Sequence, residues 1–307
     1  MNAESYHRAR RGVVFGITAY GLWGLFPLYF NQLRDAVPWH EQLAQRAFWA
    51  FVVLVIFVMM RRLGCLVRDV TPKKCLILAI SGMLLAVNWG GFLYAVSSGQ
   101  VLQSSLGYFM APLANVALGV IFFRDPLGAW RWVSIGLAAV GVAIWASLVG
   151  SLPWIALLLA ISFSLYGLIR KKVKIDGFVG LAIEMGWVVP FSGGYLAHLL
   201  NTGTLTPVST TVQAMFIGSG IITPLPLVFF AAAARRLKLS TIGMLQYITP
   251  SCQLLVAVAI LGEAFEMYKL VSFVFIWAAV AVYVWESMRT VRAAVKKEEE
   301  EAVLTPD

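Results

Sequence analysis

The chain has 307 residues, of which 60% are hydrophobic and 13% carry a charge, whereas a typical soluble domain has about 25% charged residues. With a mean hydropathy of +0.81, the chain has more apolar surface than a soluble fold with a wetted exterior can cover. The sequence therefore predicts an integral membrane protein and excludes a soluble enzyme, a secreted disulfide scaffold and a disordered regulator.

Ten stretches of the sequence are long and apolar enough to cross a membrane. A helix needs about 20 mostly apolar residues to span a hydrocarbon core of about 30 Å. The basic start of the chain runs directly into the first stretch without a small-residue cleavage site, so we expect an uncleaved helix there and no signal peptide. We expect an all-α polytopic membrane protein with ten transmembrane helices, over residues 12–33, 39–60, 74–96, 101–123, 129–149, 153–170, 178–200, 212–234, 239–261 and 267–288.

The positions of the basic residues predict how these helices are oriented. Most of the 24 lysines and arginines fall at the two ends of the chain and in every second loop, near residues 61–74, 124–131, 170–174 and 235–238. The other loops contain only Arg34 and Lys269. Because cytoplasmic loops carry the excess of Lys and Arg, both termini are expected in the cytoplasm. Loops beside anionic lipid then explain the net charge of +9, and no nucleic-acid partner is needed.

Two segments of the chain match weakly at an offset of 138 residues. Pro112 aligns with Pro250, and thirteen residues after each of them an acid, Asp125 or Glu263, stands at the end of the stretch. Since five stretches per half is an odd number, the second half must lie inverted in the membrane relative to the first. Inverted repeats are typical of transporters that expose one site to each face in turn. The predicted units are residues 1–150 and 151–290, followed by a short charged cytoplasmic tail over 291–307.

Prolines punctuate the predicted helices. Each proline removes a backbone donor and frees a carbonyl that lipid cannot satisfy, so it is expected to face protein or a water-filled cavity. A simple packing kink is the alternative for any one of them. Together they favour a central cavity lined by broken helices that act in gating, at Pro112, Pro190, Pro224, Pro226 and Pro250.

Two charged residues lie deep within the predicted helices, where charges are costly and usually functional. Arg46 and Glu184 are related by the same offset of 138, so opposite charges occupy equivalent positions in the two halves. We expect Arg46 to hold an anionic group of a substrate, such as a carboxylate, near the outer end. We expect Glu184 to take up a proton or contact a cation near the inner end. A structural ion pair between them and separate roles at two ends of a pathway both stay open.

Polar and aromatic side chains gather on the same helices. An apolar cavity with a few fixed polar groups and many ring faces suits an amphipathic or amino-acid-like solute, and cation–π contact with an organic cation is a further option. Helix packing is the alternative for each aromatic residue. The remaining candidates for substrate binding are Trp23, Asn88, Trp89, Tyr94, Tyr108, Gln246 and Tyr247.

The sequence carries no signature of an enzyme. It has no HExxH, no GxSxG elbow and no Gly-rich phosphate loop, and its three cysteines and three histidines lack metal-ligand spacing. We therefore expect no catalytic residues, no metal and no cofactor. A membrane-embedded enzyme or assembly factor is the alternative to a transporter, and a chemically altered product in place of a moved one would favour it.

Short motifs touch nearly the whole chain: Ala19-Tyr20, Trp23-Gly24-Leu25, Pro27-Leu28-Tyr29, Glu41, Arg46, Trp49, Asn88-Trp89, Tyr94-Ala95-Val96, Ser105–Phe109, Pro112-Leu113, Leu165–Lys172, Gln246-Tyr247, Pro250 and Glu263. In these motifs the chain resembles the RarD-type permeases of the EamA family, within the drug/metabolite transporter superfamily. The resemblance implies ten helices in two inverted halves, in a bacterial inner membrane, that move small organic solutes. Gln103, Ala111 and Asp125 depart from the pattern, where an acid, Asn and Glu are common, so a coupling role of these positions is not carried over.

We therefore expect a secondary carrier or facilitator of small metabolites or drug-like molecules, with export as one direction, that works by alternating access. Its surroundings are the lipid bilayer and its partner is a small-molecule substrate. A coupling proton is an option, and the oligomeric state is left open.

Overall fold

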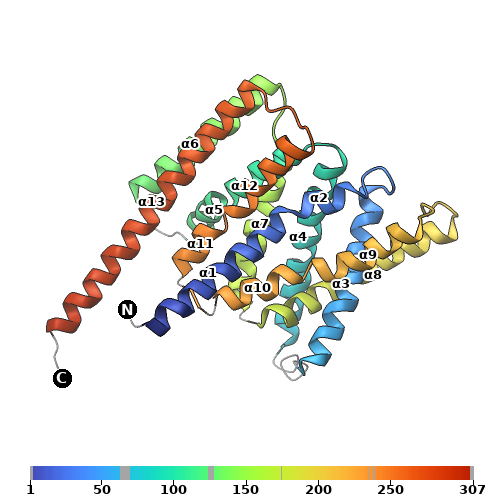
Figure 1. Cartoon of the computed structure of the whole chain (residues 1–307), viewed down its shortest axis with the longest axis horizontal. Coiled ribbons are helices and arrows are strands. Elements are labelled where there is room, and N and C mark those ends of the chain that lie inside the picture. The colour runs from blue at the N-terminus through green and yellow to red at the C-terminus, as the bar shows by residue number, and fades with distance from the viewer. Residues whose placement is uncertain are drawn as a thin grey trace.

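The computed structural model describes residues 3–62, 70–123, 128–173, 175–234, 236–237 and 239–304, and this part of the chain consists of helices and the turns that join them (Figure 1). Each of the ten predicted stretches is helical in the described residues, which confirms the all-helical fold there. The helices are α1 (Ala3–Gly24), α2 (Phe26–Asn31), α3 (Trp39–Met60), α4 (Pro72–Ser97), α5 (Val101–Phe123), α6 (Ala129–Val149), α7 (Trp154–Val173), α8 (Gly177–Asn201), α9 (Thr210–Ile222), α10 (Leu225–Ala234), α11 (Leu239–Leu245), α12 (Ile248–Leu255), the π-helix η2 (Val256–Ile260) and α13 (Met267–Leu304).

Several of these helices are suited to a membrane by length and composition. Within the described residues, Trp154–Arg170 and Ile248–Ile260 are apolar but shorter than a full span. A polytopic membrane protein is thereby supported, whereas the count of ten spans stays a prediction. The six segments long and apolar enough to cross are Arg10–Asn31, Trp39–Met60, Pro72–Ser97, Ala129–Leu148, Thr210–Ala233 and Met267–Glu286.

Large apolar side chains cover the outside of the bundle. Ile56 of α3, Trp132 of α6, and Phe191 and Leu200 of α8 are all exposed. A soluble monomer rarely exposes extended apolar surface, because water disfavours it. These side chains face the hydrocarbon when the bundle lies in a bilayer.

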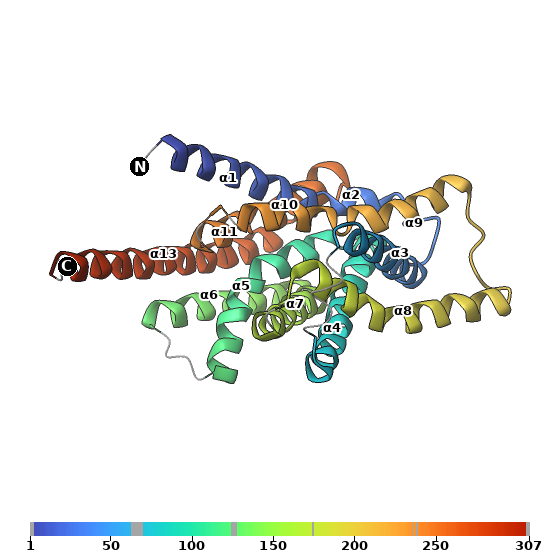
Figure 2. The same ribbon diagram turned by 90° about the horizontal axis from the view of Figure 1, so that it is seen from below.

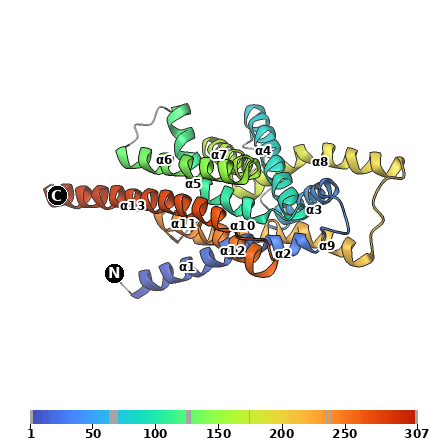
Figure 3. The same ribbon diagram turned by 90° about the horizontal axis from the view of Figure 1, so that it is seen from above.

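The helices form a bundle with α6 and α13 side by side on one flank and α3, α8 and α9 on the other (Figure 1, Figure 2 and Figure 3). Between the flanks, α7 packs on both α4 and α5, and α1 lies along α10 and α12. The start of α1 and the end of α13 lie toward the same side in all three views. The predicted tail from residue 291 continues α13 as a helix to Leu304.

Three of the predicted stretches are interrupted. Turns separate α1 from α2 at Leu25, α9 from α10 at Thr223–Pro224, and α11 from α12 at residues 246–247. Pro224 lies in the second break and Pro226 at the start of α10, and Pro250 follows the third break by a few residues. Interrupted helices leave backbone groups without their usual hydrogen-bond partners. At these three sites the backbone is available for other hydrogen bonds and the helices can bend.

The predicted helix breaks at Pro112 and Pro190 are wrong, because α5 and α8 continue through these positions. A proline removes one backbone donor, but the hydrogen bonds of the adjacent turns keep the helix on course. Beside Pro112, the hydroxyl of Ser164 in α7 donates to the carbonyl of Ala111 at 2.9 Å. The carbonyl that Pro112 leaves without an amide donor is that of Tyr108, four residues earlier, so the Ser164 contact ties α7 to α5 beside the proline without replacing the missing hydrogen bond.

Two glycines let helix backbones touch. A Cβ on Gly82 of α4 would lie 2.6 Å from the carbonyl oxygen of Glu184 in α8. A Cβ on Gly220 of α9 would lie 2.5 Å from the carbonyl oxygen of Trp49 in α3. The obstacle is backbone in both cases, and backbone cannot rotate aside as a side chain can. Only glycine permits these two helix pairs to lie so close.

We expect Gly82→Ala and Gly220→Ala each to lower the stability of the folded protein by about 1–3 kcal/mol, because the added methyl group must push two backbones apart. The measurement is thermal unfolding of the purified protein in detergent micelles. Gly136→Ala in α6 is the matched control, since its Cβ meets nothing within 4 Å and alanine favours the helix. Equal melting temperatures for wild type, Gly82→Ala and Gly220→Ala would contradict the close contact.

Candidate functional site

Arg46 lies in the interior of the bundle, where three aromatic rings surround its guanidinium. The side chain comes from α3 and is only 3% exposed. The guanidinium carbon lies 4.2 Å from the ring centroid of Trp89 in α4, and 4.8 Å and 5.5 Å from those of Phe30 and Phe26 in α2. Cation–π attraction to ring faces strengthens when water is removed, so the rings replace part of the lost hydration.

The polar contacts of Arg46 are fewer than a buried guanidinium needs. Its Nε donates to Thr223 Oγ1 at 3.2 Å, and Thr223 stands at the break between α9 and α10, beside Pro224. Its Nη1 is buried without an acceptor among the described residues. Within the described ranges, no carboxylate lies within 4.0 Å of this guanidinium. A cation with an unused donor is therefore held between two interrupted helix pairs, α1/α2 and α9/α10.

Asn88 and Tyr108 extend this cluster along the neighbouring helices. The Tyr108 hydroxyl of α5 donates to Asn88 Oδ1 at 3.2 Å. The Asn88 amide nitrogen donates to the Leu159 carbonyl at 3.1 Å and to Ser162 Oγ at 3.0 Å, both in α7. Asn88 directly precedes Trp89, so this network fixes the turn of α4 that covers the guanidinium. The term Arg46 site is used below for Arg46, Phe30, Asn88, Trp89, Tyr108 and Thr223.

Glu184 belongs to a second, separate cluster. Its carboxylate is fully buried and accepts from Ser81 Oγ of α4 at 2.6 Å and from the Tyr166 hydroxyl of α7 at 3.3 Å. Arg170 Nη1, from the last turns of α7, lies 3.5 Å from Glu184 Oε1. The counter-ion of Glu184 is therefore Arg170 and not Arg46, which settles the open choice in favour of two separate charge sites. These four residues are called the Glu184 cluster.

A glycine makes room for the Arg170–Glu184 pair. A Cβ on Gly180 of α8 would lie 1.8 Å from Arg170 Nη1. The guanidinium thus crosses α8 directly over the backbone of Gly180, one turn before Glu184. Any side chain at this position would displace Arg170 from the carboxylate.

The other predicted substrate residues lie in different surroundings. Trp23 packs on the rings of Tyr20 and Phe230, with centroids 5.6 Å and 6.2 Å away. Tyr94 packs on Trp39 and Trp154 at 5.8 Å and 5.3 Å. In this arrangement Trp23 and Tyr94 serve to pack aromatic rings together. They would contact a solute at the Arg46 site only if the helices rearranged.

Tyr247 and Gln246 stand at the break between α11 and α12. The ring of Tyr247 stacks on Phe109 of α5 at 6.3 Å, and its hydroxyl is buried without a hydrogen-bond partner in the described part of the chain. Gln246 is half-buried beside it. An unused hydroxyl next to a helix break is a second place where a polar solute group can be received.

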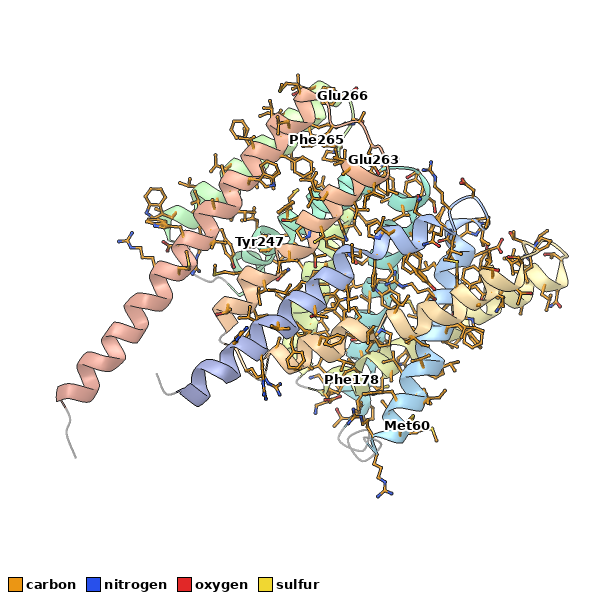
Figure 4. All side chains as sticks on the ribbon, in the orientation of Figure 1. Met60, Phe178, Tyr247, Glu263, Phe265 and Glu266 are labelled. Atoms are coloured by element: carbon orange, nitrogen blue, oxygen red, sulfur yellow. The ribbon has the colours of Figure 1, made fainter. Side chains whose placement is uncertain are left out.

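Glu263 fastens α5 to the loop that precedes α13. Its two carboxylate oxygens accept from the backbone amides of Val101 at 2.6 Å and Leu102 at 2.9 Å, at the start of α5. Figure 4 shows Glu263, Phe265 and Glu266 together at one end of the bundle and Met60 and Phe178 at the other. Burial raises the pKa of the Glu263 carboxyl above its usual range, although the two amide donors act in the opposite direction.

Sequence reasoning missed Phe30, Thr223, Ser81 and Arg170 as members of the two clusters. Thr223 precedes a proline, and that signal marks a helix break. Arg170 belongs to a basic run that signals topology equally well, so its inward direction had no separate signal. Phe30 and Ser81 are ordinary helix residues, and no pattern in the sequence distinguishes them.

The chain is similar to known membrane proteins along nearly its whole length. Residues 10–147 match the EamA-like transporter family. An uncharacterized transporter of Pseudomonas aeruginosa is 39% identical over 287 residues, which cover 92% of this chain and 96% of that protein. The protein RarD of Escherichia coli is 39% identical over 295 residues, which cover 94% of this chain and 99% of that protein. A solved crystal structure with 18% identity matches 91% of this chain and 98% of its own with a TM-score of 0.59, which supports the fold alone.

We expect Gly180→Ala to destabilise the protein by about 1–3 kcal/mol, because the guanidinium of Arg170 must shift and its ion pair with the buried Glu184 is weakened. Thermal unfolding in detergent measures this, and adding Glu184→Gln to Gly180→Ala should restore much of the loss. Gly193→Ala, in the same helix, meets nothing within 4 Å and should be neutral. A Gly180→Ala protein as stable as Gly193→Ala would contradict the described path of Arg170.

Proposed function

Because the chain belongs to the EamA-like transporter family, with RarD proteins among its relatives, we propose that it moves small organic solutes across a bacterial inner membrane by alternating access. The observation that carries this proposal is the position of Arg46, a buried cation with an unused donor between two interrupted helix pairs. In transporters, discontinuous helices form the substrate site because their freed backbone groups line a cavity.

The proposed mechanism uses residues 1–150 and 151–290 as two inverted five-helix halves. Gly82 and Gly220, like Arg46 and Glu184, are related by the offset of 138, and each glycine touches the backbone of the other half. The helix contacts are reciprocal: α4 packs on α8 as α9 packs on α3, and α5 packs on α7 as α12 packs on α1. These pairs support the repeat, while Asp125, the predicted counterpart of Glu263, lies outside the described residues.

In this proposal Arg46 contacts the solute and the Glu184 cluster controls access from the cytoplasmic end. Arg170 lies near the end of α7, in a loop region that the distribution of basic residues assigns to the cytoplasm. Arg170 and Glu184 belong to the same half, so a movement of one half against the other would part Glu184 from Ser81 of α4 and not from Arg170. A buried carboxylate that loses a hydrogen-bond donor is destabilised, which favours uptake of a proton or contact with a solute cation. Glu184 is thus the proposed coupling site.

A membrane-embedded enzyme or assembly factor is the second candidate. It would use the same buried charges to hold a lipid-soluble substrate or a protein. The unused Arg46 donor is compatible with either function, but interrupted helices on both sides of it favour transport.

We expect saturable flux into proteoliposomes for at least one member of a panel of organic anions, amino acids, organic cations and chloramphenicol. Arg46→Gln should reduce this flux by about 10-fold or more, because a charged hydrogen bond to the solute is lost. Glu184→Gln should abolish the response to an imposed pH gradient if the carrier is proton-coupled. Arg61→Gln, an exposed arginine of the same helix, is the control for Arg46→Gln. Normal transport by both Arg46→Gln and Glu184→Gln at equal protein levels would overturn these roles.

The proposed orientation, with both termini in the cytoplasm, predicts which end of the bundle an impermeant thiol reagent reaches. Met60 and Met267 are both exposed, at opposite ends of the bundle (Figure 4 labels Met60 and the neighbouring Glu266). In a background with every cysteine replaced by serine, Met267→Cys should be labelled in intact spheroplasts and Met60→Cys only after permeabilisation. The reverse pattern would invert the topology.

A further inference from the structure

The charge balance of the bundle interior is incomplete at Arg46. The fully buried Glu184 has Arg170 as its counter-ion, so that pair is close to neutral. Arg46 is equally buried, yet the described residues offer it no carboxylate within 4.0 Å. Removing a charge from water without a counter-ion is costly, and arginine cannot lose its proton to avoid the cost. The site is therefore short of one negative charge.

The geometry indicates where that charge belongs. Aromatic rings cover the faces of the guanidinium, and Thr223 occupies its Nε. The unused donor is Nη1, at the end of the planar group. Carboxylates bind guanidinium in its plane and through its N–H groups, and such charge-assisted hydrogen bonds are short and strong. An oxygen of a carboxylate at Nη1 completes both the hydrogen bonding and the charge.

The same contacts disfavour a cationic solute. The ring faces of Trp89 and Phe30, which an organic cation would need, are already occupied by the protein's own cation. The sequence left organic cations and amino-acid-like solutes open, since aromatic residues alone do not show what they bind. A second cation at low dielectric would be repelled by Arg46, and the ammonium of an amino acid would find no acid beside it within the described residues.

We propose that the Arg46 site selects small organic monocarboxylates with an apolar body and no ammonium group. This inference rests on the proposed transport function and names its substrate class. One carboxylate neutralises one guanidinium, and the apolar part of the solute would lie against the surrounding aromatic side chains once the helices around the buried Arg46 move apart to admit it. A dicarboxylate brings a second charge for which the described site has no cation, because Arg170 is engaged by Glu184.

The test uses four probes with nearly the same skeleton that differ in charge: 3-phenylpropionate, L-phenylalanine, 2-phenylethylamine and neutral 3-phenylpropanamide. Binding to the purified full-length protein in detergent micelles is measured by isothermal titration and by the rise in melting temperature, in a chloride-free sulfate buffer. We expect 3-phenylpropionate to bind about 10-fold or more tightly than each of the other three, which lack the anion or add a cation. Chloride is titrated separately.

The variants separate recognition from folding. Arg46→Gln should weaken 3-phenylpropionate about 10- to 100-fold, while Arg46→Lys, which keeps the charge but loses the planar group, should lie between it and wild type. Thr223→Val should have a smaller effect, and Arg61→Gln none. If Arg46→Gln does not fold, the Lys and Val variants still give the order of affinities.

Three results would overturn the substrate class: tighter binding of phenylalanine or phenylethylamine, equal binding of all four probes, or binding of chloride that leaves no further effect of the carboxylate. The first two leave the transport proposal intact, because flux of another solute class is measured independently. Arg46-dependent binding of 3-phenylpropionate without any flux would support the class and instead reject transport.

Discussion

A guanidinium ion inside a bundle of apolar helices must be stabilised by something other than water. In this protein the replacement comes from two kinds of helix. The interrupted helices supply the rings of α2 and the hydroxyl of Thr223 at the turn between α9 and α10, and the continuous helix α4 supplies Trp89. The Asn88–Tyr108 hydrogen bond joins α4 to α5 next to Trp89.

The two halves of the chain each place a charged residue inside the bundle, but the two charges have different partners. Arg46 and Glu184 are equivalent in sequence offset, but Glu184 is satisfied from within by Ser81, Tyr166 and Arg170. Arg46 retains a donor without an acceptor among the described residues. The paired carboxylate of Glu184 holds helices together, whereas the unpaired donor of Arg46 is free to bind another group. In the proposed transport function, this asymmetry assigns access and coupling to the Glu184 cluster and solute recognition to the Arg46 site.

Much of this arrangement follows from sequence patterns, and the exceptions have physical causes. Apolar length predicts the helices, and the positions of Arg46 and Glu184 deep within them correctly predict that both charges are buried. The ion pair between Arg170 of α7 and Glu184 of α8 does not follow from such patterns. It depends on the direction of the Arg170 side chain, and the space for that direction exists because residue 180 is a glycine. Proline marks where a break is permitted, but α5 and α8 continue as helices through Pro112 and Pro190. Of the rings assigned to a solute, that of Trp89 packs on the protein's own cation, whereas those of Trp23, Tyr94 and Tyr247 pack on other aromatic side chains.

The long last helix has a consequence for the end of the bundle toward which both termini lie (Figure 1). α13 has 38 residues, which corresponds to about 57 Å at 1.5 Å per residue, and its apolar part ends near Glu286. Figure 1 shows the remaining turns running straight on, away from the other helices. Because the last turns of α13 continue as one straight helix, they cannot fold back over the end of the bundle. It projects from the bundle as a straight helix, so a molecule that binds its last turns is held away from the apolar part of the bundle.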